Sequence, residues 1–380
     1  MVNAKAQVMN PGRVNKKDGR IPRGEKRPWL FEAFPGLTQC IPWTPLIEAP
    51  TPVQRLAKVS AQVGSEIWIK RDDRSSQTYG GNKPRKLEFI LGDALAQNRT
   101  TLLTGGGLGT NHGLATTIFG KKFGFRVILG LFDQPVTSHV RKNLLLYKAY
   151  GAEILYVGSL LKAVLRYYVT ERIRHRGAYF IAPGGSSPLG ALGYVDAALE
   201  LAMQVVRNEV PLPKTIYVAV GTCGTMAGLV LGLRLAGLET KVIGVQVAPG
   251  PFANPRAVLR LAGKTLGLMQ RNDRSVPKVE LTLDTVPVDS LHFGAGYGHP
   301  TDAARDAIEL MSETEGINLD LTYTGKAFGA LLDNVKAHPE DEPVLFWNTF
   351  NSVDLSSVAE SLTFHALPEA FHRFFQGEVK

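Results

Sequence analysis

The sequence is poor in cysteine and lacks the short motifs of several enzyme classes. Its 380 residues include two cysteines, Cys40 and Cys223, which cannot build a disulfide framework or a multi-cysteine metal site. No H-E-x-x-H, G-x-S-x-G or C-x-x-C motif occurs, so zincin, α/β-hydrolase and thioredoxin chemistry lose most of their support. The N-terminus has no secretory apolar core, and we find no apolar run long enough to span a bilayer. We therefore expect a cytoplasmic protein with no bound metal and no membrane partner.

Outside the N-terminal segment, the excess of basic over acidic residues is also small. The chain has 43 basic and 34 acidic residues, a net charge of +9. Residues 1–28 carry eight basic and two acidic side chains, so this segment accounts for +6 and the rest of the chain for +3. We interpret residues 1–28 as a basic flexible arm. Because a body near neutrality does not attract polyanions, we expect no nucleic-acid partner; a nucleic-acid-binding arm on a degenerate enzyme body is the remote alternative.

The rest of the composition is that of a globular protein, with 44% hydrophobic and 20% charged residues. Strand and helix patterns alternate from about residue 64, which predicts parallel sheets covered by helices on both faces. Such folds bind ligands beyond the carboxyl ends of strands and against helix N-termini, so glycine-rich turns there are the candidate sites. The predicted strands are 64–73, 101–104, 126–131, 153–157, 179–182, 214–220, 241–247 and 344–347; the predicted helices are 82–97, one from about 111, 138–150, 160–175, 189–206, one after 221–228, 301–315 and 325–337.

Residues 80–86, Gly-Gly-Asn-Lys-Pro-Arg-Lys, place a lysine at the start of a predicted helix. The two glycines let the backbone bend sharply and approach a ligand. Because the helix dipole disfavours a cation at this end, we expect it to lower the pKa of Lys83 and to favour the neutral amine. A neutral lysine amine is what Schiff-base chemistry requires. The alternative interpretation is an ordinary basic surface turn.

Residues 221–228, Gly-Thr-Cys-Gly-Thr-Met-Ala-Gly, follow the strongest strand pattern in the chain. Small residues and hydroxyls at such a turn form a nest of N–H donors that holds a phosphate, unless the turn serves only tight packing. The segment lacks both the G-x-G-x-x-G spacing and the lysine of a nucleoside-triphosphate loop, which disfavours a nicotinamide dehydrogenase and favours a single-phosphate cofactor. The candidate phosphate ligands are Gly221, Thr222, Cys223, Gly224 and Thr225.

Two further segments offer polar groups beside glycines. Thr110, Asn111 and His112 follow a glycine-rich strand end, where they can cap a helix or hold a substrate carboxylate. Tyr297 and Tyr323 each stand close to glycines and could bring a phenol near a reacting centre. Taken alone, a histidine or a tyrosine in such a place is more often a structural residue.

In order along the chain, these segments resemble the pyridoxal-phosphate enzymes of the tryptophan-synthase β-subunit fold. More narrowly, they are similar to the D-cysteine desulfhydrase and 1-aminocyclopropane-1-carboxylate deaminase family over about residues 51–330. The resemblance implies an α/β fold of two doubly wound parallel-sheet domains (PLP fold type II), with pyridoxal 5'-phosphate as cofactor and a homodimer. It places residues 29–97 and 187–380 in a large cofactor-binding domain and residues 98–186 in a small one.

The resemblance also implies a role for each candidate residue. Lys83 is the Schiff-base lysine and the base that takes the Cα proton, and residues 221–225 bind the cofactor phosphate. Thr110, Asn111 and His112 secure the substrate carboxylate, and Asn111 also contacts the cofactor. Either Tyr297 or Tyr323 assists proton transfer at the leaving group, and the sequence does not choose between them. Cys223 departs from the family pattern, in which a small residue is usual at this position.

Thr324 bears on the choice between the two activities of the family. In the deaminase a glutamate follows the second tyrosine and faces the pyridine nitrogen, whereas desulfhydrase-like members have a threonine, as here. A hydroxyl implies a weaker electron sink than a carboxylate, which suits elimination of a good leaving group better than opening of a cyclopropane ring. We therefore expect a lyase that converts a small D-amino acid, D-cysteine above all, to pyruvate, ammonia and sulfide. Deamination of 1-aminocyclopropane-1-carboxylate, or another PLP-dependent amino-acid reaction, is the alternative.

Overall fold

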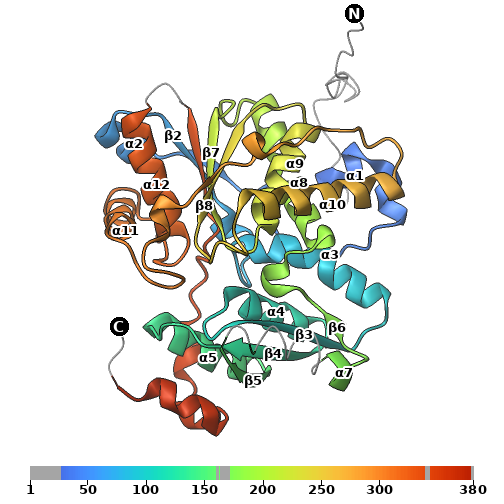
Figure 1. Cartoon of the computed structure of the whole chain (residues 1–380), viewed down its shortest axis with the longest axis vertical. Coiled ribbons are helices and arrows are strands. Elements are labelled where there is room, and N and C mark those ends of the chain that lie inside the picture. The colour runs from blue at the N-terminus through green and yellow to red at the C-terminus, as the bar shows by residue number, and fades with distance from the viewer. Residues whose placement is uncertain (1–26, 160–161, 163–171, 339–342, 378–380) are drawn as a thin grey trace, which may run out of the picture.

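The computed structural model describes residues 27–159, 162, 172–338 and 343–377. Residues 1–26 of the basic arm expected over 1–28, and most of the helix expected over 160–175, lie outside them. Within the described residues the chain forms two parts, each built on one sheet and the helices that pack on it, and the two lie one above the other in Figure 1. We call them the larger and the smaller layer.

The larger layer contains a six-stranded sheet in the order β1-β2-β10-β7-β8-β9. All neighbouring strands are parallel, as predicted, except β1 and β2, which are antiparallel. A three-residue edge strand such as β1 has no periodicity that a sequence reveals. The strands are β1 (Val53–Arg55), β2 (Ile67–Lys70), β7 (Thr215–Val220), β8 (Lys241–Gln246), β9 (Val288–Asp289) and β10 (Val344–Trp347).

Helices cover both faces of this sheet. Alternate residues of the fully buried strand β7 point to opposite faces: Ile216 and Val218 join one apolar core and Tyr217 joins the other. The helices that share the first core are α1 (Trp29–Ala33), α3 (Asn82–Ala96) through Phe89, α8 (Pro188–Val206), α9 (Gly224–Leu235) and α10 (Pro255–Asn272); those that share the second are α2 (Ala57–Val63), α11 (Asp302–Glu315) and α12 (Thr324–Ala337).

The smaller layer contains a four-stranded parallel sheet in the order β5-β4-β3-β6. Its main apolar core is shared with α3 (Asn82–Ala96), α4 (Asn111–Lys122) and α5 (Ser138–Ala149). The strands are β3 (Thr101–Gly107), β4 (Arg126–Phe132), β5 (Glu153–Gly158) and β6 (Tyr179–Phe180), and a short helix, α7 (Arg172–Arg174), precedes β6.

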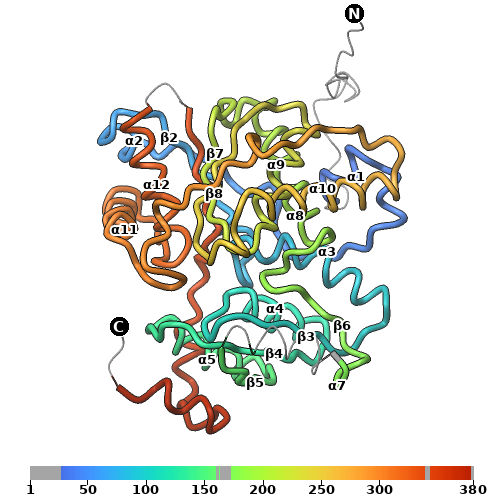
Figure 2. Tube along the Cα trace, viewed as in Figure 1, coloured from blue at the N-terminus to red at the C-terminus, as the bar shows by residue number. Residues whose placement is uncertain are grey.

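The C-terminal segment also lies on the smaller layer. After β10 the chain leaves the six-stranded sheet and passes to α5, as the red end of the tube in Figure 2 shows. Leu355, Ala359, Leu367 and Phe371 are buried in the core of the smaller layer. Residues 355–371, which the sequence analysis placed with the large domain, therefore pack with the small one. This segment includes α13 (Ser356–Glu360) and a 3-10 turn over Glu369–Phe375.

Two long helices differ from what the sequence suggested. The sequence analysis identified no helix over α10, although Asn254 caps it by accepting a hydrogen bond from the Ala257 N–H and Pro255 starts it. Helix α8 corrects the expectation that no apolar run could span a bilayer, because it is the one helix of the described residues with the length and hydropathy to do so. About 72% of its apolar window is buried inside the molecule, as in a core helix.

Candidate active site

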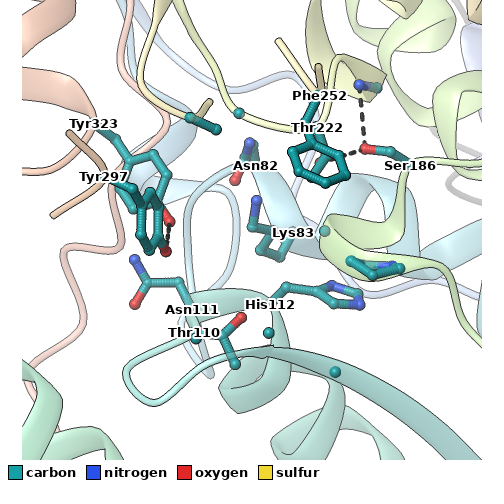
Figure 3. Close-up of a pocket in the computed structure, with 18 of the residues that line it drawn as sticks. Asn82, Lys83, Thr110, Asn111, His112, Ser186, Thr222, Phe252, Tyr297 and Tyr323 are labelled. Carbon is teal, nitrogen blue, oxygen red and sulfur yellow. Dashed lines mark hydrogen bonds between the residues drawn. The ribbon is translucent and has the colours of Figure 1, made fainter. Parts of the chain in front are cut away.

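The predicted site residues meet at a cavity of about 550 Å³ that residues of both layers line. The segments that follow β2, β3, β7 and β10 all reach it, as the carboxyl ends of parallel strands predict. Every site residue selected from the sequence lines this cavity except Thr324. Figure 3 shows Lys83 pointing into the space between the two tyrosines on one side and Ser186 and Thr222 on the other.

Lys83 is held at the first turn of α3 by a sharply bent backbone. Gly81 has a φ of +85°, a left-handed conformation that favours glycine, and its N–H donates to the Asp72 carbonyl at 2.8 Å. The cavity walls desolvate the lysine and lower its pKa to about 8, although the charge of Asp320 opposes the shift. The direction agrees with the prediction from the sequence. The main cause is burial.

Partners outside the turn fix the hydroxyls of residues 221–225, the turn predicted to bind a phosphate. The Ser186 and Thr222 hydroxyl oxygens lie 2.7 Å apart, and the Asn82 side-chain amide donates to the Thr225 hydroxyl at 3.0 Å. Cys223, at the N-cap of α9, has a φ of +65° and donates its thiol hydrogen to the Phe252 carbonyl, with sulfur and oxygen 3.1 Å apart. Of the N–H groups at this turn, that of Gly224 already donates to the Ser186 hydroxyl at 3.2 Å.

Lys86 is a cavity residue that the sequence analysis quoted but gave no role. Its side chain is buried, and its one hydrogen bond, to the Gly184 carbonyl, is long at 3.3 Å. Burial, assisted by the charge of Lys83, lowers its pKa well below the ordinary lysine value. The amine lies beside Gly224, since a Cβ built on this glycine would come within 3.1 Å of the Lys86 Nζ. A buried amine at a turn of hydroxyls and N–H groups is the environment that an anion such as phosphate completes.

The predicted carboxylate site is the N-terminus of α4, where some polar groups have no role in holding the described residues together and are available to a ligand. The Thr110 hydroxyl caps α4 by accepting a hydrogen bond from the Gly113 N–H. The Asn111 side-chain oxygen accepts from Asn143 at 3.3 Å and lies 3.0 Å from a ring nitrogen of His139, which leaves the Asn111 amide hydrogens available.

His112 offers a further unsatisfied group at the same turn. It is buried, and neither of its ring nitrogens has a hydrogen-bond partner among the residues that the structure describes. Burial, and then the charges of Lys83 and Lys86, lower its pKa well below the ordinary histidine value. A neutral imidazole with one N–H to donate suits an anionic group placed in the cavity.

The two predicted tyrosines form one pair. Their hydroxyl oxygens are 2.6 Å apart, and their rings meet edge to face. Burial raises the pKa of both, but the hydrogen bond between them lowers that of Tyr297 and raises that of Tyr323. Tyr297 is therefore the more acidic member. Its loop is tied to α12 by the buried Lys326, which donates to the Phe293 carbonyl at 2.6 Å.

Thr324 is buried behind the cavity, and Asp320, which the sequence analysis missed, lines it. The Asp320 carboxylate accepts the Thr324 hydroxyl hydrogen at 2.6 Å and also accepts from the backbone N–H groups of Thr322, Tyr323 and Thr324 at 2.9–3.0 Å. Asp320 lies three residues before the N-cap of α12, Tyr323, and so outside the position at which a capping residue is recognised in a sequence. In the described residues, no group of three or more His, Cys, Asp or Glu side chains is placed to hold a metal ion.

Comparison with known proteins gives a consistent assignment. Residues 45–349 match the model of the family described as pyridoxal-phosphate dependent enzymes. The chain is 38% identical to the D-cysteine desulfhydrase of Salmonella schwarzengrund (strain CVM19633) and 37% identical to that of Salmonella newport (strain SL254). Each alignment spans 315 residues, which is 80% of this chain and 92% of the relative.

Solved structures show the same fold. A crystal structure described as an ACC deaminase homologue is 31% identical, with a TM-score of 0.74, and the match covers 89% of this chain and 100% of that one. A hydrogen sulfide-producing enzyme from Fusobacterium nucleatum is 16% identical, with a TM-score of 0.54 and coverage of 80% and 95%, and shows the likeness of fold alone.

The chain therefore belongs to the pyridoxal-phosphate-dependent enzymes, with the α/β fold of the tryptophan-synthase β-subunit type. Its cofactor is pyridoxal phosphate. The cavity fits this group, because the buried Lys86 amine and the unpartnered His112 ring both lack the anionic partner that a phosphate or a carboxylate supplies.

Proposed function

We propose that this enzyme is a D-cysteine desulfhydrase that converts D-cysteine to pyruvate, ammonia and sulfide. The observation that carries the proposal is the placement of Lys83, with a pKa lowered to about 8, in one cavity with the hydrogen-bonded pair of Tyr297 and Tyr323. A base and an acid are the two groups that β-elimination requires. The identity to curated D-cysteine desulfhydrases supports the choice of substrate.

Each residue has a role in this proposal. Lys83 would hold pyridoxal phosphate until the substrate amine displaces it; the cofactor would then supply an electron sink for negative charge at the substrate Cα and leave the Lys83 amine free. The Lys83 Nζ takes the Cα proton, since a pKa near 8 keeps a useful fraction of the amine neutral at physiological pH. Thr110, Asn111 and His112 hold the substrate carboxylate through the N–H groups at the start of α4 and their side chains.

The tyrosine pair acts at the leaving sulfur. Either hydroxyl could donate in this pair; the direction in which Tyr323 donates to Tyr297 fits the lower pKa of Tyr297 and would leave the Tyr297 hydroxyl hydrogen free for transfer. We propose Tyr297 as the proton donor and Tyr323 as the residue that stabilises its conjugate base. Replacing Tyr297 with Phe should lower kcat for sulfide release about 10²–10⁴-fold, the usual range for loss of a general acid.

The lysine assignment is tested by trapping the cofactor. Purified protein should be yellow, and borohydride reduction followed by peptide mass spectrometry should place the cofactor on Lys83. The Lys83→Ala protein should be colourless, whereas Lys58→Ala, a lysine outside the cavity, should stay yellow. Cofactor recovered on any other lysine overturns the assignment.

The substrate assignment is tested by comparing products. D-cysteine should release sulfide, and 1-aminocyclopropane-1-carboxylate should not release ammonia. The reverse pattern would favour the deaminase reaction that the structural neighbour's description names. L-cysteine is the matched control for the enantiomer, and equal rates would reject the D-amino-acid assignment.

We further propose that the enzyme is a cytoplasmic homodimer with a small amino-acid substrate and no nucleic-acid or membrane partner. The resemblance to the family supports the dimer. Cys40, which is exposed, and Cys223, which is buried, are both free thiols, in keeping with a reducing compartment. Sedimentation equilibrium with twice the 41.3 kDa chain mass is the expected result for the dimer.

A further inference from the structure

One face of α5 carries three polar side chains that bond to the turn at residues 109–111, where α4 begins. They are His139, Asn143 and Tyr147, and their spacing of four residues places side chains on the same face of a helix. Each of the three contacts a different residue of the turn. Tyr147 is the simplest case, because its buried hydroxyl donates to the Thr110 carbonyl at 3.0 Å. A second helix therefore helps to hold the turn that begins α4.

Asn143 is oriented by the backbone of that turn. It is 2% exposed, and its side-chain nitrogen lies 2.9 Å from the Gly109 carbonyl oxygen. Because a carbonyl only accepts, the nitrogen and the oxygen of this amide cannot exchange places. One hydrogen of the Asn143 amide goes to Gly109, and the other faces the Asn111 side chain at 3.3 Å. The Asn111 atom at this position must therefore be its oxygen.

His139 supports the same orientation of Asn111. Its Nε2 lies 3.0 Å from the Asn111 Oδ1, which can only accept, so Nε2 carries a hydrogen in this arrangement. The Asn143 nitrogen also lies 3.1 Å from Nε2, but its two hydrogens are already placed on Gly109 and Asn111. Two donors thus converge on one oxygen and leave both amide hydrogens of Asn111 to the cavity. In Figure 3 the Asn111 side chain points from the turn toward the tyrosine pair.

We propose that Asn143, assisted by His139, is a positioning residue that fixes the Asn111 amide with its hydrogens toward the substrate carboxylate. The inference rests on the proposed function, in which Asn111 binds that carboxylate. An Asn111 side chain turned over would present its oxygen instead, and two acceptors do not form a hydrogen bond. Because the amide is oriented before the substrate arrives, binding does not have to order it.

The neighbouring His112 supports an anionic ligand at this place. Its side chain is 2% exposed and lines the same cavity. Neither ring nitrogen has a hydrogen-bond partner within the described part of the chain. The first N–H groups of α4 also lack partners within the helix, as at every helix start. Asn111 is thus one of several donors, and it is the one whose orientation α5 decides.

The test uses two ligands that differ only in a carboxylate. Phosphopyridoxyl-D-alanine and phosphopyridoxyl-ethylamine are the reduced adducts of pyridoxal phosphate with D-alanine and with ethylamine, and neither can react further. Isothermal titration calorimetry with full-length apoprotein gives a Kd for each, and the ratio of the two isolates the carboxylate. Asn143→Leu should raise the Kd of phosphopyridoxyl-D-alanine about 10–100-fold, as for a lost hydrogen bond to a charged group. The Kd of phosphopyridoxyl-ethylamine should change by less than about threefold.

A double-mutant cycle separates positioning from a general loosening of the fold. If Asn143 acts through Asn111, Asn143→Leu should have no further effect on the Kd ratio of Asn111→Leu protein. His139→Leu removes the other donor to the same oxygen and carries the test if Asn143→Leu fails to fold, whereas His139→Gln keeps a donor and should keep the wild-type ratio. Arg141→Gln is the matched control, because it breaks two bonds from α5 to the C-terminal segment and should leave the ratio unchanged.

The outcomes distinguish this inference from the proposed function. A Kd ratio that rises in Asn111→Leu but keeps its wild-type value in both Asn143→Leu and His139→Leu would overturn the positioning role and leave the proposed function standing. Additive effects of Asn111→Leu and Asn143→Leu on the ratio would also overturn it. A ratio unchanged by Asn111→Leu would reject Asn111 as a carboxylate ligand, and with it the positioning role. The expected ratios in an enzyme that releases no sulfide from D-cysteine would reject the proposed substrate and leave the role of Asn143 standing.

Discussion

Two lysines three positions apart face the same cavity from α3, and their surroundings suit them to different tasks. Lys83 points into the open space of the cavity, whereas Lys86 lies against the turn at Gly224. Burial lowers the pKa of both, and for Lys83 the value of about 8 sets the pH range in which it is a free base. The amine is charged below that pH and neutral above it.

For Lys83 we predict a reactivity that levels off near pH 8. In apoprotein, trace acetylation followed by peptide mass spectrometry should show the Lys83 rate rising with pH up to about 8 and then remaining constant. An ordinary lysine, with a pKa near ~10.4, keeps gaining reactivity over the same range and serves as the internal control. A Lys83 rate that climbs in parallel with exposed lysines up to pH 10 would show that the cavity does not desolvate it.

For Lys86 we predict a role specific to the phosphate. Replacing it with Met should raise the Kd for pyridoxal phosphate about 10–100-fold, because a hydrogen bond to a charged group contributes roughly 1.5–3 kcal/mol. Pyridoxal, which has no phosphate, is the matched ligand, and its Kd should change by less than about threefold. The apoprotein should not lose stability, since the variant removes a buried amine that has only one long hydrogen bond. An equal rise in Kd for pyridoxal phosphate and for pyridoxal would show that Lys86 does not act on the phosphate.

At the scale of single elements, the start of α3 depends on two closely packed glycines, Gly80 and Gly81, of which Gly81 also has a positive φ. A Cβ built on Gly81 would lie 2.7 Å from the carbonyl oxygens of both Thr349 and Phe350, and its φ of +85° adds strain for any other residue. Gly124 also has a positive φ, of +77°, but nothing lies within 4 Å of its Cβ position. Comparing substitutions at Gly81 and Gly124 therefore separates the effect of close packing from that of backbone strain.

We predict that Gly81→Ala costs more free energy of unfolding than Gly124→Ala. Strain alone accounts for about 1–2 kcal/mol in each variant, and overpacking against two carbonyls adds roughly 1–3 kcal/mol at Gly81. Urea unfolding of the apoproteins measures the difference. Gly81→Ala should also bind cofactor more weakly, because the backbone movement that relieves the overpacking displaces Lys83. Equal costs with normal cofactor binding would mean that the loop over Gly81 yields without disturbing the site.

The sequence indicates most elements that build the site, and physical limits explain what it misses. Alternating patterns with glycine-rich turns locate the ends of β3 and β7, and with them the segments that line the cavity. The role of Lys86 stays hidden, because burial of a lysine is a property of the packed structure. Asp320 was missed because it lies three residues before the N-cap of α12, outside the position that marks a helix start in a sequence. Helix α10, by contrast, carried a readable signal in Asn254 and Pro255.

At the scale of the whole molecule, buried charges connect α3 to the larger layer. Arg85 donates to Asp72 at 2.9 Å and to Glu200 at 2.9 Å, and Lys70 donates to Glu200 at 2.5 Å, all within the protein interior. Although burial alone would raise it, the pKa of Glu200 is lowered to about 2 by Arg85 and Lys70. The cluster holds the helix of Lys83 on β2 and α8, and its two positive charges balance its two negative charges.

We predict that breaking this cluster is costly at neutral pH. Glu200→Gln should destabilise the apoprotein by about 3–5 kcal/mol, the range for removing one partner of a buried ion pair. Because folding lowers the pKa of Glu200, its stabilisation is present above the unfolded pKa and is lost as the pH falls through the folded value of about 2. The difference between wild type and variant, measured by urea unfolding, should therefore stay constant from pH 8 to pH 6. A difference below about 1 kcal/mol would show that the cluster is not strongly coupled to folding.

The core of the smaller layer is completed by the C-terminal segment, which follows the last strand of the larger layer, β10, in the chain. Phe371 is 1% exposed in the core shared with α4 and α5, and Arg141 of α5 donates to the carbonyls of Phe374 and Gly377 at 2.8 Å. Phe328 is equally buried in the core beneath the six-stranded sheet. Truncating either ring leaves a cavity of similar size in one layer only.

Phe371→Ala should therefore loosen the smaller layer first. Each variant should cost about 3–5 kcal/mol, but hydrogen exchange should rise in β3 and β4 for Phe371→Ala and in β7 and β10 for Phe328→Ala. Since the segments that follow β3 and β7 face each other across the cavity, loosening either layer should weaken cofactor binding. Faster exchange in β7 and β10 of Phe371→Ala, with β3 and β4 unchanged, would instead assign residues 355–371 to the folding unit of the larger layer. Because those residues pack on one layer and are joined in sequence to the other, this comparison decides whether spatial contact or chain order defines the cooperative unit.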